Sequence, residues 1–444
     1  METNFTKITN VWQNYQTALN DLPRLSQIKA FRDQVICDLD FRLSLEDNLH
    51  QVLASEYPML GLCDVSLFLP SKLNKEIIED LSPTLEALIL RDALDLDANF
   101  RHLQRQLDPS HGGWMIWRNL QIGRYSREDT STRSSQITHI PYAIELSEGC
   151  SGGCSFCGVS AQSLQNSGLS FKDGNELYQA LLEVLGNACG LLSQYGVLYW
   201  ATDPLDQPDY EYYANLFHQK FGLWPITTTA LAENHIERIR GMLRSPAAER
   251  PWGLRCSMRS RFAYRKLFKE LTPLERGVIR FLPQYPESSS QHALAGRSFN
   301  KDTASQQTQS GGTIACMSGF LISLPKREIQ LITPCLAEPK NLNGYRVLGR
   351  DSFTSIEDLP NAFNKLLEIL PCPPIQLDTL LTITIDISQF YLYNSSNFPG
   401  LLERLNESPT SLSQLTSAKM FSWSYSRLFS HCLELLQYGV LKAV

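Results

Sequence analysis

The chain has 444 residues, of which 43% are hydrophobic and 19% are charged, and its 46 acidic and 40 basic side chains give a formal net charge of −6. This composition is that of a globular protein, so it excludes a fully disordered or fibrous chain. The acidic balance gives no bulk attraction to nucleic acid or anionic lipid, and no apolar run approaches the roughly 20 residues that span a bilayer. We therefore predict a cytoplasmic protein with neither a membrane nor a nucleic acid as a partner.

Residues 1–137 are predicted to form an N-terminal helical domain that ends in a linker. Apolar residues recur three and four positions apart there, as in Leu81, Leu85 and Leu88, which is the spacing of a helix with one buried face. Residues 124–137 are polar and lack this periodicity. A second domain is therefore expected to begin at residue 138.

Residues 138–340 alternate between expected strands and expected helices. Strands are predicted at 142–146, 196–201, 225–229 and 252–257, and helices are predicted to begin near 173, 208 and 234. Such alternation favours parallel βα units in an α/β barrel or part-barrel, with the chemistry on loops that follow the strands. Residues 313–324 and 328–333 are expected to form a hairpin that ends this barrel.

Two further segments complete the chain. Residues 284–312 are rich in Ser, Gln, Thr and Gly, and a loop of that length is usually a lid or a binding loop. Residues 341–444 are predicted to form a C-terminal α+β domain, with a helix through Leu359, Phe363 and Leu366, a strand over 381–387 and two final helices. This order resembles the winged-helix elements that recognise leader peptides, and a plain capping domain is the alternative.

Three of the 11 cysteines cluster directly after the strand expected at 142–146. Cys150, Cys154 and Cys157 have the spacing C-x3-C-x2-C among several glycines, which permit the tight backbone path that would bring three thiols together. Structural zinc normally has four protein ligands, and no second pair is present; His139 lies before the strand, which carries it away from the loop. An iron–sulfur cluster with three protein ligands leaves one iron open to a cosubstrate. We favour the cluster over zinc or three unligated thiols.

The cysteine spacing, with Phe156 before the third cysteine and a strand before the first, resembles the radical S-adenosylmethionine (SAM) superfamily. The resemblance implies a partial (β/α)6 barrel and one [4Fe–4S] cluster held by Cys150, Cys154 and Cys157. It also implies SAM as cosubstrate at the open iron, with its adenine near the backbone of Phe156, and an electron donor of the flavodoxin or ferredoxin type.

Four further residues are expected to contact SAM by the same resemblance. The turn at 201–209 resembles the family's Gly-Gly-Glu segment, so Thr202 and Asp203 would bind the SAM amino group, although the glycines are missing and Asp replaces Glu. Ser257, at the end of an expected strand, and Arg265, in the next helix, would bind the carboxylate and ribose. A strand cap and a solvated helix arginine are the alternatives for these two residues.

Cys335 is the predicted catalytic thiol. It follows the strand expected at 328–333, and we expect it on the barrel face that carries the cluster. A thiol there can return a hydrogen atom to a Cα radical from the face opposite to abstraction, and this inverts the residue. The segment 318–346 also resembles the radical SAM epimerases that act on ribosomal peptides of the proteusin kind.

The sequence therefore predicts a peptide epimerase that converts L- to D-residues in a ribosomally made precursor peptide with a leader. No C-x2-C pair follows Cys157, so we expect a single cluster and no sulfur-to-carbon crosslinking. Cys372 is the alternative hydrogen donor. The alternative functions are another radical SAM reaction on a peptide, such as dehydrogenation or carbon–carbon bond formation, and a non-catalytic iron–sulfur scaffold or redox sensor.

Overall fold

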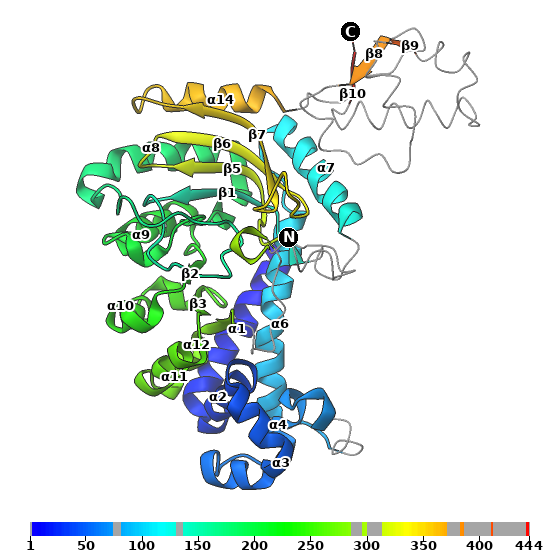
Figure 1. The fold of residues 1–444 in the computed structure, drawn as a ribbon, viewed down its shortest axis with the longest axis vertical. Helices are drawn as coiled ribbons and strands as arrows, with labels where there is room; N and C mark the ends of the chain where they lie inside the picture. Colours follow the sequence, from blue (N-terminus) through cyan, green and yellow to red (C-terminus); the bar gives the residue numbers. More distant parts are fainter. Residues whose placement is uncertain are drawn as a thin grey trace.

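The structure is a computed structural model that describes residues 2–73, 81–129, 136–285, 295–299 and 313–370, together with three short strands beyond them. It is a mixed α/β protein in which helices predominate and the strands form small sheets (Figure 1). The α/β class expected from the alternating pattern is thus confirmed at this coarse level.

The N-terminal part is helical, as predicted. Asp38 caps one of its helices by accepting a hydrogen bond from Phe41 N at 3.4 Å, and Thr84 caps another through Ala87 N at 3.4 Å; such caps satisfy backbone donors that the first turn leaves free. The helices of this part are α1 (Glu2–Asp21), α2 (Pro23–Cys37), α3 (Leu39–Glu56), α4 (Leu62–Val65), η1 (Ser66–Phe68), α6 (Leu85–Gln106) and α7 (Gly112–Glu128).

Strands and helices then alternate as expected, except that no strand forms among the described residues between α8 and α9. The longer helices have an apolar face, and α8, for example, buries Leu177, Leu181 and Leu185. The elements are β1 (Ile140–Glu145), α8 (Phe171–Cys189), η3 (Gly190–Tyr195), η4 (Pro204–Asp206), α9 (Tyr210–Phe221), β2 (Thr227–Thr229), η5 (Ala232–Asn234), α10 (Ile236–Leu243), η6 (Pro246–Ala248), β3 (Leu254–Met258), α11 (Arg261–Glu270), α12 (Pro273–Val278), β4 (Arg280–Pro283) and η7 (Gly296–Ser298). Strands β2, β3 and β4 pair in parallel in that order.

A second sheet has the order β1-β5-β6-β7, with β5 (Met317–Ser323), β6 (Glu328–Pro334) and β7 (Tyr345–Ser352). Strand β5 is parallel to β1, and β6 returns antiparallel to β5, so the predicted hairpin is confirmed. The hairpin joins β1, however, and not the far end of the strand series at β4. Every residue of β5 is buried, which suits a central strand with a neighbour on each side.

Within the described ranges the strands form no closed barrel. Among the described residues, Val197 connects the backbones of the two sheets by single parallel bridges to Ala143 and to Ile226. Of the strand predicted at 196–201, the structure forms only the bridges of Val197. Farther along this segment, the backbone N–H of Ala201 donates to the side chain of Glu145, at 2.9 Å from Oε1, and not to a neighbouring strand. A backbone donor bound in this way cannot extend the ladder.

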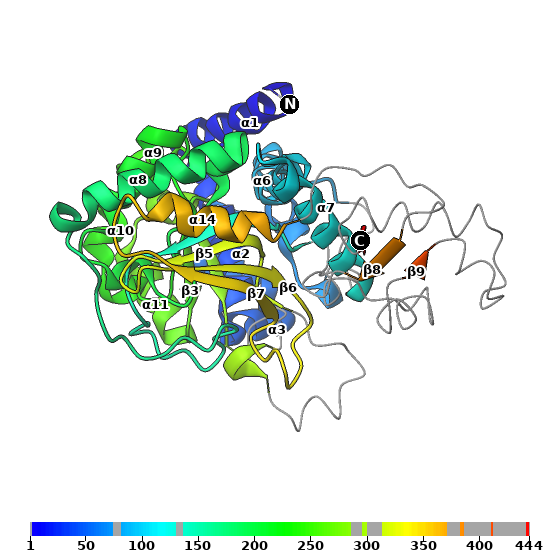
Figure 2. The ribbon, with the colours of Figure 1, turned by 90° about the horizontal axis from the view of Figure 1, so that it is seen from above.

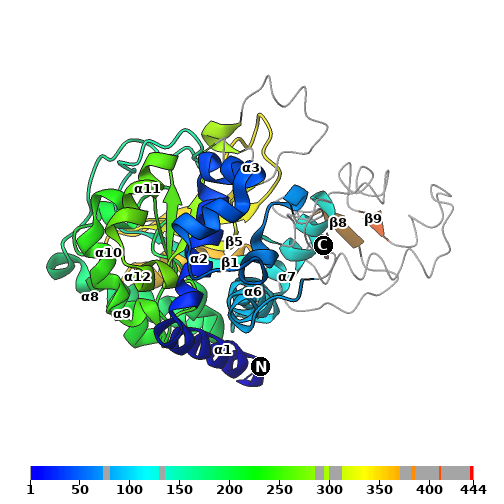
Figure 3. The ribbon, with the colours of Figure 1, turned by 90° about the horizontal axis from the view of Figure 1, so that it is seen from below.

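One hydrophobic core joins the N-terminal helices to the α/β part. Trp12 of α1 packs edge-on against Trp252, just before β3, with ring centroids 5.0 Å apart, and its Nε1 donates to Ala248 O at 2.9 Å. Figure 3, the view from below, shows α1, α2, α3 and α6 lying across this side of the sheets.

The opposite side of the β1-β5-β6-β7 sheet is covered by α14 (Leu359–Glu368), which confirms the helix predicted through Leu359, Phe363 and Leu366 (Figure 2). Phe363 packs against Phe320 of β5 with ring centroids 4.2 Å apart. Beyond it, β8 (Thr382–Ile385), β9 (Thr410–Ser411) and β10 (Leu441–Ala443) form an antiparallel sheet in the order β10-β8-β9. The final helices predicted there, and Cys372, lie outside the described residues. None of the described helices has the length and apolar character of a membrane span.

Candidate functional site

The cysteine loop follows the carboxyl end of β1, and neighbouring backbone fixes its path. Gly149 has φ +79°, and a Cβ there would lie 2.3 Å from Ser163 O, so only glycine fits. Cys150 N donates to Gln162 O at 2.8 Å, and Glu148 N donates to Asn166 O at 2.7 Å. The segment 162–166 therefore holds the first half of the loop.

Glycine also leaves room between two of the sulfurs. A Cβ on Gly152 would lie 3.2 Å from Cys150 Sγ and 3.4 Å from Cys154 Sγ. Backbone N–H groups point at the sulfurs: Gly152 N lies 3.3 Å from Cys150 Sγ, and Ala161 N lies 3.3 Å from Cys157 Sγ. Such donors stabilise a thiolate.

Cysteine thiolates are ligands both of zinc and of iron–sulfur clusters. In the part of the chain that the structure describes, no three His, Cys, Asp or Glu side chains gather closely enough to hold one ion. Zinc would need its sulfurs about 2.3 Å from a common centre, whereas a cluster takes each thiolate on a different iron. Burial raises the pKa of Cys150 to about 12 and also raises that of Cys154, so metal binding would displace protons from these thiols.

Two arginines that the sequence analysis did not select hold the loop from outside. Arg259 Nη1 donates to Gly152 O at 3.1 Å, and its other amino group pairs with Glu233. Arg297 donates from Nη1 to Cys154 O and from its backbone N to Cys157 O, each at 2.9 Å. Arg259 lies two residues after Ser257 at the end of an expected strand, which is a signal that sequence reasoning could have used, whereas nothing in the polar segment around Arg297 distinguished it.

Asp203 is buried close to the cysteines. Its Oδ1 accepts from Thr229 Oγ1 at 2.7 Å and from Leu205 N at 3.0 Å, and its Oδ2 accepts from Ala230 N at 2.7 Å. Burial raises its pKa to about 6, against the effect of these hydrogen bonds. The side chain thus ties the turn after Val197 to the end of β2, and the negative charge of Asp203 raises the pKa of Cys150 and of Cys154.

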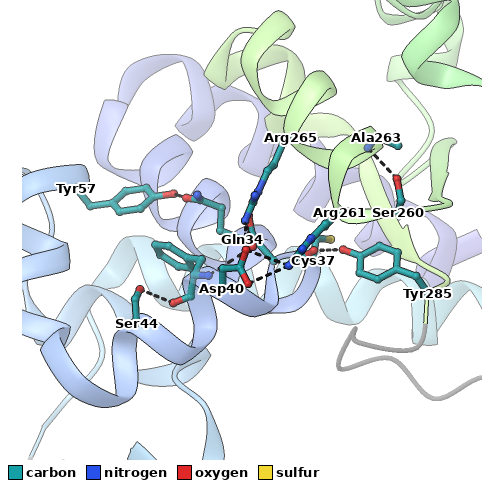
Figure 4. A network of polar contacts seen from close by, with 12 residues as sticks. Gln34, Cys37, Asp40, Ser44, Tyr57, Ser260, Arg261, Ala263, Arg265 and Tyr285 are labelled. Atoms are coloured by element: carbon teal, nitrogen blue, oxygen red, sulfur yellow. Dashed lines mark hydrogen bonds and ion pairs between the residues drawn. The ribbon is translucent and has the colours of Figure 1, made fainter.

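The other residues predicted to contact SAM lie in several parts of the fold. Thr202 and Phe156 are half-buried, and Ser257 lies half-buried in β3 opposite Leu282. Arg265 pairs with two carboxylates of the N-terminal region, 2.6 Å from Asp38 Oδ2 and 2.9 Å from Asp40 Oδ2 (Figure 4). Its guanidinium therefore connects α11 to the helical part, whereas Arg259 and Arg297 contact the cysteine loop.

Cys335 does not lie at the edge of the sheet where it was expected. Strand β6 runs antiparallel to β5, and β5 runs parallel to β1, so β6 ends beside the start of β1 and not beside the cysteine loop. Cys335 is fully buried, and its backbone N donates to Gly344 O at 2.9 Å. The expectation was wrong because the second strand of an antiparallel hairpin ends at the edge of the sheet opposite to the end of the first strand, and the first strand, β5, runs parallel to β1.

A cavity of about 640 Å³ lies between α6 and the strands, and residues of both line it. Val159, two residues after the last cysteine, forms part of its wall, and so does Cys316 at the start of β5. Burial raises the pKa of the Cys316 thiol, so it is protonated at neutral pH. Cys316 was not selected from the sequence because it lies within the strand expected at 313–324, where a cysteine most often packs as a small hydrophobic residue.

Comparison with known proteins gives one distant relative. The chain is 27% identical over 364 residues to a protein of Sinorhizobium fredii named "Uncharacterized protein y4wI", and the match covers 78% of this chain and 70% of the relative. No protein-family model and no solved structure matches the chain.

Proposed function

We propose that this protein is a radical SAM enzyme that epimerises residues of a ribosomally made peptide. The observation that carries the proposal is the cysteine loop, in which a Cβ on Gly152 would lie 3.2 Å from Cys150 Sγ and 3.4 Å from Cys154 Sγ and after which Val159 forms part of the wall of a cavity of about 640 Å³. The three cysteines would hold a [4Fe–4S] cluster. With SAM bound, that cluster supplies a 5′-deoxyadenosyl radical that takes a hydrogen atom from a substrate carbon.

We also propose that the strands form the open, partial (β/α)6 barrel that the resemblance implies. The single bridges of Val197 to Ala143 and Ile226 support this arrangement, because they connect β1 in parallel to the β2-β3-β4 sheet. The joined strands then enclose the cavity on one side, and α6 closes it on the other through Asp97, Phe100, Arg101 and Gln104.

The protein's own residues would position SAM and exclude water. Asp203, with Thr202 beside it, lies on the turn after Val197 and is coupled by charge to Cys150, as expected of a group near the SAM amino group. Phe156 lies within the loop itself. We assign the role proposed for Arg265 to Arg259 instead, because Arg265 is engaged by Asp38 and Asp40.

Hydrogen return requires a thiol on the side of the Cα radical opposite to abstraction. The S–H bond breaks, a Cα–H bond forms, and the resulting thiyl radical regains a hydrogen when a flavodoxin- or ferredoxin-type donor supplies an electron and water supplies a proton. Cys316 is the better placed candidate because it lines the cavity as a protonated thiol, whereas Cys335, the donor predicted from sequence, follows a strand that ends at the sheet edge away from the cysteine loop. Cys372 is the third.

The test begins with anaerobic reconstitution of the full chain, followed by measurement of iron content and of 5′-deoxyadenosine formed from SAM under strong reductant. Co-expression with a candidate precursor peptide in heavy water then follows, with chiral amino-acid analysis. We expect D-residues that carry deuterium at Cα, and loss of epimerisation with persistent SAM cleavage when the donor cysteine is replaced by alanine. If the reconstituted chain forms no 5′-deoxyadenosine even with peptide present, the non-catalytic iron–sulfur reading is favoured. A change in peptide mass in ordinary water would indicate dehydrogenation or crosslinking.

A further inference from the structure

The cavity beside the cysteine loop contains more positive than negative charge. Arg101, Arg250 and Arg255 line it, and Asp97 is the one acidic residue among the described lining residues. Guanidinium groups keep their charge at neutral pH, so the described lining has an excess of two positive charges, three minus one.

Asp97 cannot compensate all of these charges, because several arginines share it. It accepts from Arg255 Nη2 at 2.6 Å and pairs with Arg101, and Arg280 Nη2 approaches it at 3.6 Å. These arginines hold the pKa of Asp97 far below its usual range, despite burial that opposes them. Asp97 therefore stays ionised, and its single charge is divided among three cations.

Arg250 lies deepest in this group, with only 3% of its surface exposed. It donates from Nη1 to Trp224 O at 2.5 Å, and its guanidinium carbon lies 5.9 Å from the ring centre of Phe100. Burial lowers its pKa to about 10, so it remains charged at neutral pH. A charge buried to this extent is costly without an ionic partner.

A second observation indicates a ligand at the same place. Gln104 is 4% exposed and lines the cavity, yet within the described structure its side-chain Nε2 has no hydrogen-bond partner. Buried amide donors are almost always satisfied. An acceptor from a bound molecule would satisfy this one and neutralise the arginines together.

We propose that the cavity binds a carboxylate of the peptide substrate, through Arg250, Arg101 and the amide of Gln104. The identity of the ligand as a peptide rests on the proposed function. Arginine forks recognise carboxylate and phosphate alike, but Ile140, Val197 and Ile226 also line this cavity, and an aliphatic stem that ends in a carboxylate fits such a wall. The volume of about 640 Å³ is within the range of roughly 300 to 1,000 Å³ typical of ligand sites.

The residues that line the cavity relate the proposed carboxylate site to the cysteine loop. Arg255 lies in β3 beside Thr228 of β2, and Arg250 precedes the same strand, whereas Val159 of the cysteine loop forms another part of the same cavity. A residue held by its carboxylate would thus extend from the arginines toward the cysteine loop. Burial raises the pKa of Cys316, and the charges of Arg101 and Arg255 oppose this rise, so the thiol lies within reach of their field.

The test uses the full chain without cluster or SAM and measures binding by calorimetry and by the rise in melting temperature. The probes are acetyl-Gly-Glu-Gly-amide for a side-chain carboxylate, acetyl-Gly-Gln-Gly with a free C-terminus for a terminal carboxylate, acetyl-Gly-Gln-Gly-amide as the neutral control, and inorganic phosphate, all at equal ionic strength. We expect one carboxylate peptide to bind at least about tenfold more tightly than the neutral peptide, because charge-assisted hydrogen bonds are the stronger ones. Equal binding of the charged and neutral peptides, or a response to phosphate alone, overturns the proposal.

Variants separate a binding role from a structural one. Arg101→Gln removes one cation while Asp97 keeps Arg255 and Arg280, so the ligand-free melting temperature should stay or rise while the preference for carboxylate is lost. Gln104→Leu should weaken binding without this change in charge. Arg91→Gln on the exposed side of the same helix, where Arg91 pairs with Asp92, is the matched control and should bind as wild type.

A preference retained in Arg101→Gln, or a lower ligand-free melting temperature with unchanged affinity, assigns Arg101 to structure and overturns its role. The outcome is independent of the radical chemistry. If the chain produces 5′-deoxyadenosine but binds carboxylate peptides no more tightly than the neutral peptide, this inference alone is overturned. If the chain binds carboxylate peptides more tightly than the neutral peptide but binds no cluster, the proposed function alone is overturned.

Discussion

Replacing Gly152 with alanine is the most direct test of the cysteine loop. The new Cβ would lie 3.2 Å from Cys150 Sγ and 3.4 Å from Cys154 Sγ, a few tenths of an ångström closer than ordinary contact. The φ angle of Gly152 is not among the positive ones, so alanine fits the backbone. Without a cluster the two thiol side chains can rotate slightly, and the loss of unfolded-state entropy offsets this strain by about 0.4 to 1 kcal/mol.

We therefore expect Gly152→Ala to leave the free energy of unfolding of the cluster-free chain within about 1 kcal/mol of wild type. Once irons fix the sulfurs, the methyl group can no longer be accommodated, so iron bound per chain after reconstitution should fall severalfold. Gly153→Ala is the matched control: it has nothing within 4 Å of the new Cβ but has φ +58°, and alanine in that region costs about 1 to 2 kcal/mol.

The two variants should thus have opposite effects on stability and on iron binding. Gly153→Ala should lose stability in urea unfolding and keep its iron, whereas Gly152→Ala should keep stability and lose iron. A Gly152→Ala protein that reconstitutes with the same iron content and visible absorbance as wild type would refute the view that the space between these sulfurs belongs to a cluster.

Two further predictions concern groups near the loop. Arg297→Gln removes the donors to Cys154 O and Ala161 O, so the reconstituted cluster should lose iron to a chelator severalfold faster, while an unchanged rate would contradict the role of this arginine as a clamp. Burial raises the pKa of Glu145 from 4.5 to about 7, so the folded chain holds a proton that the unfolded chain releases, and stability should fall as pH rises through this window, by at most about 1.4 kcal/mol per pH unit. Glu145→Gln keeps an acceptor for Ala201 N and should flatten that slope in urea unfolding at several pH values; an unchanged slope would assign it to other groups.

Local patterns in the sequence predicted individual elements well. The strand predicted at 142–146 matches β1 within two residues, and the apolar face through Leu359, Phe363 and Leu366 located α14. The position of the cysteine loop directly after β1 was also predicted, because cysteine spacing and glycine content are local properties of the sequence. These features depend on residues that lie close together in the sequence, and the spacing of apolar residues indicates such local structure.

Features that depend on the order of strands in space were not predictable in this way. Periodicity does not say which strand β5 joins. Cys335 was misplaced although the hairpin was expected, because an antiparallel return carries the end of β6 to the sheet edge away from the cysteine loop. The strand expected at 196–201 failed because Glu145, some 55 residues earlier, takes the backbone N–H of Ala201. The arginines of the cavity were missed because they come from α6, from β3 and from the segment before β3, which only the folded chain brings together.

The contact between Trp12 and Ala248 has a consequence for the order of events during synthesis. Their hydrogen bond joins residues 236 positions apart. At about 5 to 20 residues per second on the ribosome, helix α1 waits on the order of ten to fifty seconds before the partner of its buried indole exists. The apolar face of α1 must remain without its final packing for that interval, so a chain terminated before β3 should be prone to aggregation although its first helices are complete.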